Sequence, residues 1–377
     1  MAKIADAFSI IRNGANIKQG LDDSGYPITR IETISNRTVD RNKMGYAGVT
    51  DISKYFDYVL QNGDILMSHI NSETHLGKVA LYEKQEDETI IHGMNLLCLR
   101  PKKELLDSRY AFYYLSSDAF LRQIPRITKK SVNQASFNVA ALKELTIPIP
   151  KIEKQRDIVR GLDKVSELIA LRKEQLAKLD RLVKSRFIEL FGDPNTNPMK
   201  WKKEQLQINA TLLNGRAYKQ DELLDDGKYP VLRVGNFFSN RGWYYSDLEL
   251  DEDKYCDDGD LLYAWSASFG PRIWNGGKVI YHYHIWKVLV GEKYNKQFLC
   301  HLLDYATASF MGDTHGIGMM HLTKSGMEET EFIVPPIDLQ NQFTAFVEQT
   351  NKSKLAIQQS LDKLELLKKS LMQEYFG

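Results

Sequence analysis

The sequence predicts an α+β protein in which one unit, a mixed α/β domain followed by a long helix, occurs twice. The prediction rests on a gapless internal repeat of 38 residues and on a regular apolar stripe in both copies of that repeat. The chain has 377 residues, enough for two or three domains, and its 43% hydrophobic and 26% charged residues are typical of globular proteins. We therefore expect two mixed α/β domains separated by two long helices, related by a pseudo-twofold internal repeat.

Residues 1–150 form the first predicted domain. Alternating apolar positions over 77–82 predict a strand, and the aromatic-rich segment 108–121 predicts a helix. Within 121–143 there are five basic side chains and no acidic one, which is typical of a phosphate-binding surface and equally of an ordinary solvated surface. The amino-terminal segment lacks the apolar core of a signal peptide, and no apolar run is long enough to cross a membrane.

One long helix is predicted over 151–192 and a second over 336–377. Aligning 155–192 with 340–377, a constant shift of 185, gives ten identical positions without a gap. These are Gln155/Gln340, Leu176/Leu361, Lys178/Lys363, Leu179/Leu364, Leu182/Leu367, Lys184/Lys369, Ser185/Ser370, Glu189/Glu374, Phe191/Phe376 and Gly192/Gly377. Proline-rich segments precede both copies, and because proline disfavours the helical conformation just upstream, each helix should begin after them.

Each predicted helix carries an apolar stripe with alternating steps of four and three residues. In the first helix it runs through Ile158, Leu162, Val165, Ile169, Arg172, Leu176, Leu179, Val183, Arg186 and Leu190. In the second it runs through Phe343, Val347, Thr350, Lys354, Ile357, Leu361, Leu364, Lys368, Leu371 and Tyr375. This spacing indicates a coiled coil formed by the two helices. The alternative is that each helix is amphipathic and packs on its own domain.

Residues 193–335 comprise a linker and the second predicted domain. The linker, 193–198, is dense in turn-forming residues. The domain repeats short motifs of the first half: Asn13-Gly14 with Asn214-Gly215, Tyr26-Pro27 with Tyr229-Pro230, and Gly63-Asp64 with Gly259-Asp260. Apolar alternation predicts a strand over 278–290, and 295–310 predicts a helix. The region has 15 basic and 20 acidic side chains, and its acidic run 247–260 is typical of a solvated loop.

The sequence contains no catalytic or metal-binding constellation. Neither the glycine-rich turn and NPPY-like motif of a base methyltransferase nor a GxxxxGK[ST] phosphate loop is present. The triplet Glu252-Asp253-Lys254 resembles a nuclease signature, but it lies within the acidic run. His282 and His284 would share one face of the predicted strand; no third ligand is suitably spaced, which favours a packed histidine pair. The three separated cysteines favour a reducing, cytoplasmic location over a disulfide framework.

Several polar segments fit contact with DNA. Residues 128–134 carry Lys129 and Lys130, suited to phosphates, and Asn133 and Gln134, suited to adenine edges. At the shift of 185, residues 313–319 carry Thr314 and His315 beside glycines, and 266–272 with Trp274 is a second candidate surface, corresponding to 68–74. The candidate DNA-binding residues are Lys18, Arg30, Lys129, Lys130, Asn133, Gln134, Lys219, Arg233, Ser268, Arg272, Thr314 and His315. The alternative for each segment is an ordinary polar loop.

The order of these features resembles the specificity subunit of a type I restriction-modification enzyme. The resemblance covers nearly the whole chain and is carried by the half-repeat, the IPIPxxxxQ and VPPxxxQ segments, the long helices and the FGDPxTNPxxW segment at 191–201. It implies two target-recognition domains that each read one part of a bipartite double-stranded DNA target, and helices that pack antiparallel as a spacer.

The same resemblance implies partners. Two methyltransferase subunits would bind the helices, and motor-nuclease subunits would join the complex. The helix residues expected to serve this assembly are Leu162, Ile169, Leu176, Leu179, Leu361, Leu364 and Leu371. S-adenosylmethionine, ATP and magnesium would bind to the partners, so this chain would carry no cofactor and no catalytic residue.

The length of the helices fits this implied function. Residues 158–190 would span about 50 Å of helix, more than the ~34 Å of one DNA turn. Sequence-specific DNA recognition without catalysis is therefore the favoured function, although the acidic excess in 193–335 departs from a uniformly basic DNA face. The alternative is a non-enzymatic scaffold with two repeated protein-binding domains on a coiled coil. A self-contained endonuclease would need a carboxylate cluster that the sequence lacks.

Overall fold

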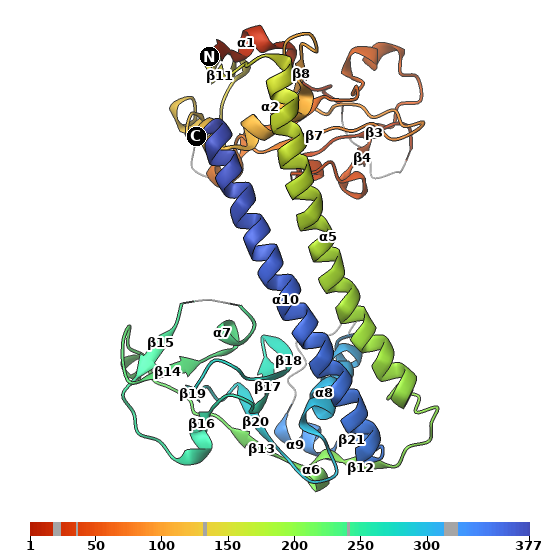
Figure 1. Ribbon diagram of the computed structural model, residues 1–377, viewed down its shortest axis with the longest axis vertical. Coiled ribbons are helices and arrows are strands. Elements are labelled where there is room, and N and C mark those ends of the chain that lie inside the picture. The colour runs from red at the N-terminus through yellow and green to blue at the C-terminus, as the bar shows by residue number, and fades with distance from the viewer. Residues whose placement is uncertain (18–23, 35–36, 131–133, 240–241, 313–322) are drawn as a thin grey trace. The chain divides into compact units, whose positions relative to one another are not determined.

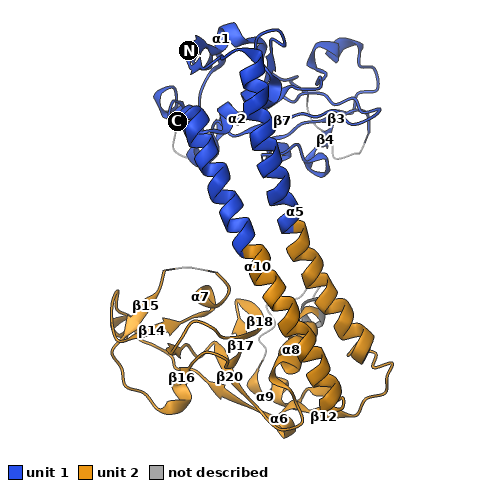
Figure 2. Ribbon diagram, in the orientation of Figure 1, with its two compact units in different colours: residues 1–173, 359–377 blue, residues 174–358 orange. Residues whose placement is uncertain are grey.

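Both long helices predicted from the repeat are present, and each has 40 residues. They are α5 (Ile152–Phe191) and α10 (Ile337–Phe376), which differ by the same shift of 185 as the sequence repeat. The computed structural model describes residues 1–17, 24–34, 37–130, 134–239, 242–312 and 323–377, with the backbone alone for 309–312. The chain divides into two compact units, residues 1–173 with 359–377 and residues 174–358, and the division passes through both helices (Figure 2).

The larger sheet of unit 1 has four antiparallel strands in the order β2–β8–β5–β7. Its strands are β2 (Phe8–Asn13), β5 (Ile65–Ser68), β7 (Val79–Leu81) and β8 (Leu96–Pro101). Side chains alternate between the two faces of a strand, so those of β5 enter two cores. Ile65 and Met67 belong to the core that includes helix α2 (Ser108–Ser116), whereas Leu66 packs with Ile34 and Leu60. Both faces of this sheet are therefore covered.

The remaining elements of unit 1 are short. They are β1 (Ala2–Lys3), α1 (Ile4–Ala7), β3 (Pro27–Ile28), β4 (Gly45–Tyr46), β6 (Ile70–Asn71), α3 (Asp118–Leu121), β9 (Lys129–Lys130), β10 (Ala135–Ser136), α4 (Val139–Glu144) and β11 (Thr146–Ile147). The prediction of one helix over 108–121 is wrong, because the segment forms α2 and α3. Ser117 between them has an extended backbone, and its hydroxyl accepts a hydrogen bond from the Phe120 amide at 3.3 Å. A serine in this N-cap position starts a new helix.

Unit 2 contains two four-stranded sheets, in the orders β13–β20–β17–β18 and β15–β14–β19–β16. Its elements are β12 (Lys203–Gln205), α6 (Leu206–Asn209), β13 (Ala210–Asn214), β14 (Tyr229–Leu232), α7 (Val234–Phe238), β15 (Tyr244–Ser246), β16 (Tyr255–Cys256), β17 (Leu261–Ser266), β18 (Ser268–Ile273), β19 (Val279–Tyr281), β20 (Ile285–Val290), α8 (Lys296–Gly312), α9 (Lys324–Glu329) and β21 (Glu331–Ile333). Helix α8 packs on β18, and Phe298 and Leu302 of α8 share a core with Tyr263 and Trp286.

The prediction of a single strand over 278–290 is wrong. The segment forms β19 and β20, which belong to different sheets, and a turn at residues 282–284 separates them. His282 and His284 therefore lie at this turn and do not share the face of one strand. Apolar residues alternate on both sides of the turn, and such a pattern does not register a change of sheet.

Within each unit the segments of α5 and α10 run antiparallel and side by side (Figure 1). In unit 1 Lys173 forms an ion pair with Glu365, at 2.8 Å between Nζ and Oε1. In unit 2 Asp180 pairs with Lys354, and the rings of Phe187 and Phe343 lie 5.4 Å apart. Every position of the two apolar stripes is at least partly buried. The stripe thus contributes to packing between the helices and to packing on the domains. Among the residues described, no helix is long and apolar enough to cross a membrane.

Candidate nucleic-acid interface

Unit 1 brings two of the predicted recognition segments together in one small sheet. Strand β10 pairs with β6 on one side and with β9 on the other. Ala135 is opposite both Asn71 and Lys130. The sequence had marked 68–74 and 128–134 as separate candidates, with Lys129 and Lys130 in a loop. The two lysines lie instead on β9, which β10 separates from β6, and Lys130 reaches Glu73 in the polar segment after β6.

This sheet presents cations beside hydroxyl and imidazole groups. Lys129 and Lys130 are exposed, and the Lys130 Nζ lies 2.8 Å from Glu73 Oε1. Ser72 Oγ lies 2.8 Å from His75 Nδ1, and both residues are exposed. Lysines of this kind suit phosphate oxygens, and hydroxyl and imidazole groups suit base edges. The ion pair with Glu73 leaves Lys129 as the stronger candidate for a phosphate contact.

Unit 2 contains a polar and aromatic pocket of about 650 Å³. Its lining includes Asp225, Arg233, Asn236, Trp243, Tyr244, Ala267, His282 and His284. Ala267 is the tip of the β17–β18 hairpin, where Ser266 pairs with Ser268, and it has a positive φ of 63°. The pocket therefore joins three features that the sequence treated separately: Arg233, the segment 266–272 and the histidine pair.

Arg233 is the most available cation of this pocket. It is exposed at the N-cap of α7, and its guanidinium carbon lies 5.2 Å from the centre of the Tyr244 ring. In the described part of the chain no carboxylate lies within ion-pair distance of it. Stacking on an aromatic ring orients a guanidinium while leaving its N–H groups free to donate. That arrangement suits a base edge or a phosphate.

The two histidines complete the wall of this pocket. Burial, together with the nearby His284 and Arg233, lowers the pKa of His282 to about 4. The two imidazole rings lie 4.7 Å apart, and the His284 ring packs edge-on against Trp265. No group of three potential metal ligands occurs among the described residues. A neutral imidazole both donates and accepts a hydrogen bond, as base recognition requires.

Comparison with known proteins identifies the family. The sequence matches the family described as "Type I restriction modification DNA specificity domain" over residues 1–181 and 198–367. The chain belongs to the type I restriction-modification specificity family. A putative type I restriction enzyme MjaX specificity subunit from Methanocaldococcus jannaschii is 32% identical over 362 residues, covering 90% of this chain and 83% of that protein. The EcoBI specificity subunit of Escherichia coli is 26% identical over 141 residues, 36% of this chain and 29% of that one.

Solved structures show the same fold. The S subunit of a type I restriction-modification system from M. genitalium has a TM-score of 0.60 at 16% identity, covering 100% of this chain and 95% of that one. A chain from a study of complex assembly and conformational transition of the type I R-M system also has a TM-score of 0.60, at 15% identity, covering 100% and 96%. At these identities the likeness concerns the fold alone.

In the structure of this specificity protein, four other predicted DNA-binding residues, Arg30, Lys219, Ser268 and Arg272, neither line the pocket nor lie in the small sheet. Arg272 is held against α7, where it lies over the rings of Phe237 and Phe238 and donates to the Phe237 carbonyl. Lys219 is exposed at a short helical turn, and Ser268 is exposed beside the hairpin tip. Arg30 is partly buried at a separate cavity of about 370 Å³. Gln134 directly precedes β10, while Lys18, Asn133, Thr314 and His315 lie outside the described residues.

Sequence analysis missed the residues that surround Arg233. Asn236, Trp243 and Tyr244 line the same pocket, and Tyr244 supports the guanidinium directly. Two adjacent aromatic residues shortly after an arginine were the available signal. Their spacing fits neither the period of a strand nor that of a helix. Their position beside Arg233 results from the pairing of β14 with β15.

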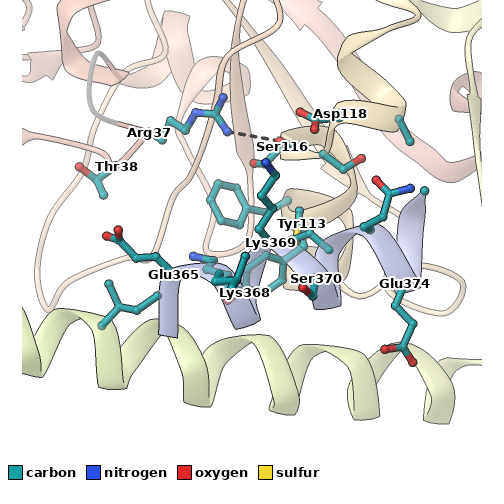
Figure 3. A pocket seen from close by; sticks show the side chains of 18 of the residues that line it. Arg37, Thr38, Tyr113, Ser116, Asp118, Glu365, Lys368, Lys369, Ser370 and Glu374 are labelled. Atoms are coloured by element: carbon teal, nitrogen blue, oxygen red, sulfur yellow. Dashed lines mark hydrogen bonds between the residues drawn. The ribbon is translucent and has the colours of Figure 1, made fainter. Parts of the chain in front are cut away.

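A further cavity, of about 1010 Å³, opens in unit 1 between α2 and the last turns of α10 (Figure 3). Its charged lining residues have both signs and are Arg37, Asp118, Lys173, Glu365, Lys368, Lys369 and Glu374. Lys368 lies over the ring of Tyr113, with 5.9 Å from Nζ to the ring centre, and burial lowers its pKa. Mixed charge at a junction of helix and domain suits a protein surface better than a DNA backbone. The cavity is therefore not part of the candidate nucleic-acid interface.

Proposed function

We propose that this chain recognises a bipartite DNA sequence for a type I restriction-modification complex, each unit binding one part, and that it has no catalytic role. The observation that carries the proposal is the pocket around Arg233, together with membership of the specificity family. A stacked arginine without an ion-paired carboxylate in the described part of the chain, a pair of histidines and an exposed hairpin tip are groups that bind base edges. The sheet with Lys129 and Lys130 provides the corresponding polar surface in unit 1.

The proposal includes a pseudo-twofold relation between the two halves. The sheet orders β2–β8–β5–β7 and β13–β20–β17–β18 support it, since each sheet places the first strand at one edge beside the last. Equivalent glycines support it as well. A side chain on Gly14 would meet the His92 carbonyl oxygen at 2.2 Å, and one on Gly215 would meet that of Tyr281 at 2.3 Å. Glycine is required at both places because the backbones approach so closely.

In this arrangement residues 1–150 and 193–335 are the recognition domains, and 151–192 and 336–377 are the spacer helices. We propose that two methyltransferase subunits dock on the helix pair and that motor-nuclease subunits join them. Exposed apolar side chains on the helices support docking, namely Leu171, Leu182, Leu355, Leu366 and Leu367. Those five lie beside the stripe, and the predicted positions Leu162, Ile169, Leu176, Leu179, Leu361, Leu364 and Leu371 would support the docking surface from within. S-adenosylmethionine, ATP and Mg²⁺ would be bound by the partners.

Exchange of one domain tests the proposed function. The chain is co-expressed with the methyltransferase encoded beside it, and the methylated sequence is mapped across the host genome. Residues 1–150 are then replaced by those of a relative in the same family. We expect one part of the mapped sequence to change while the other part and the gap stay the same. A complex that methylates DNA with an unchanged sequence, or a chain that binds only proteins, would contradict the proposal and favour a scaffold.

A further inference from the structure

Each long helix begins with a fully buried glutamine. Gln155 lies in the first turn of α5, Gln340 lies in the first turn of α10, and both are 0% exposed. They are one of the ten identical pairs of the repeat. A buried amide requires hydrogen-bond partners for both its oxygen and its nitrogen.

In unit 1 the Gln155 side chain makes three hydrogen bonds. Its Oε1 accepts from the backbone amide of Asp107 at 2.9 Å. Its Nε2 donates to the carbonyl oxygens of Leu105 at 2.9 Å and Pro150 at 2.8 Å. Asp107 is the N-cap of α2, and its carboxylate accepts from the Arg109 and Tyr110 amides. The glutamine therefore connects the start of α5 to the start of the main helix of its domain.

In unit 2 Gln340 repeats the same contact. Its Oε1 accepts from the Asn295 amide at 2.8 Å, and its Nε2 donates to the carbonyl oxygens of Lys293 at 2.9 Å and Pro335 at 2.8 Å. The Asn295 side chain accepts from the Gln297 amide at 2.9 Å, just as Asp107 caps α2. Asn295 also accepts from Thr344 of α10 at 2.8 Å. The glutamine contact, defined by these three bonds, thus occurs once in each unit.

A glutamine amide is suited to this position in a way that other side chains are not. Its oxygen binds the amide of the domain helix, and its two N–H groups bind one carbonyl in the domain and one in the proline segment before the long helix. Glutamate has no N–H to donate, and methionine of similar length has neither group. The three bonds hold the start of the domain helix in a fixed orientation against the start of the long helix.

We propose that Gln155 and Gln340 are positioning residues that set the angle of each recognition domain on its spacer helix, and thereby the gap between the two parts of the DNA target. This inference rests on the proposed function. A domain free to tilt at its attachment would reach its bases across gaps of different length. A domain held by three buried hydrogen bonds selects one gap.

The test compares Gln340→Met with the exposed, same-helix control Gln342→Met, each in the full chain with its methyltransferase partners. The probes are duplexes carrying the mapped target with the gap shortened by one base pair, unchanged, or lengthened by one or two. For Gln340→Met, which removes all three hydrogen bonds of the glutamine contact, we expect the preference for the native gap to fall by at least about tenfold. Hydrogen exchange at the Asn295 amide should accelerate, since its acceptor is lost. Gln342→Met should leave both measurements unchanged.

A Gln340→Met complex that loses protection at Asn295 yet keeps its full gap preference would overturn the positioning role. If wild-type complexes prefer no sequence at any gap, the proposed function itself fails, and the exchange at Asn295 still reports on the glutamine contact. Should Gln340→Met not fold, Gln155→Met poses the same question in unit 1. Gln340→Glu keeps the shape but turns a carboxylate oxygen toward the Lys293 and Pro335 carbonyl oxygens in place of the N–H groups, so it should broaden the gap preference as well.

Discussion

Lengthening both spacer helices should lengthen the gap in the DNA target. Four residues inserted after Lys173 in α5 and four after Gln358 in α10 lie at the boundary between the two units. The Lys173–Glu365 pair then stays within unit 1, and the Asp180–Lys354 pair stays within unit 2. The insertions change the connection between the units and none of these contacts.

The expected shift follows from helix geometry. Four residues add about 6 Å of rise and turn the helix by about 40° beyond a full revolution. On B-DNA about 6 Å corresponds to about two base pairs at ~3.4 Å each. The apolar stripe is displaced by about half a helical step, which coiled coils accommodate by a local change in supercoil. We therefore expect a gap longer by one or two base pairs and unchanged bases on both sides.

Methylation mapping of the lengthened complex measures the gap directly. The control carries the insertion in α10 alone, which leaves a turn of one helix without its partner and should lower the melting temperature without producing a defined new gap. A stable, active complex with both insertions and the original gap would refute the reasoning, because the helices would then not determine the spacing.

Three further measurements test individual sites. Arg233→Ala should weaken binding to the target by about 1–3 kcal/mol and relax the specificity for one base. The control Arg272→Ala should lower stability without relaxing base specificity, because Arg272 packs on Phe237. Equal base discrimination by the wild type and Arg233→Ala would exclude Arg233 from the interface. Lys129→Ala should reduce the slope of log affinity against log salt concentration by about 1. Lys130→Ala should reduce this slope by less, since Lys130 already pairs with Glu73. An unchanged slope in the double variant would exclude β9 from the DNA interface. Burial lowers the pKa of His92 to about 4, so between pH 6.5 and 4 the unfolded chain binds a proton at this residue that the native chain does not. The free energy of unfolding should therefore decrease by at most about 3 kcal/mol from this group as the pH is lowered through this range. The melting temperature of His92→Gln should depend less on pH than that of the wild type, and an identical dependence would contradict the assignment.

The long-range order of the fold could be predicted because the repeat is local and free of gaps. Identical residues at a shift of 185 placed both helices to within a residue of their observed ends. The repeat identified Gln155 and Gln340 as an identical pair, but the sequence could not show which backbone groups they bind. Their partners Asp107 and Asn295 lie at a shift of 188, in domains where loop lengths differ. A contact between segments with unequal shifts leaves no period in the sequence.

The sequence selected the candidate segments by residue type but did not show how the structure groups them. Lys129, Arg233 and the 266–272 segment were identified by residue type, but their grouping depends on strand pairing. The pairing of β10 with both β6 and β9 joins two segments about 60 residues apart. Because 278–290 divides into β19 and β20, the histidine pair lies at the turn between them and lines the pocket. Periodicity reports which face of a strand is buried and does not report which sheet the strand joins.

The acidic excess of 193–335 is compatible with DNA recognition because much of it serves the fold. Asp260 pairs with Lys287 at 2.7 Å, and Glu222 pairs with Arg216 at 2.7 Å. The Asp258 carboxylate accepts from the Gly277 amide at 2.8 Å. These acids are neutralised or hydrogen-bonded locally, whereas Arg233 has no acidic partner in the described part of the chain. Net charge therefore averages groups that face the protein with groups that face a ligand, and the ligand responds only to the latter. Under the proposed function, base contacts made by the pocket around Arg233 would supply the selectivity of this domain.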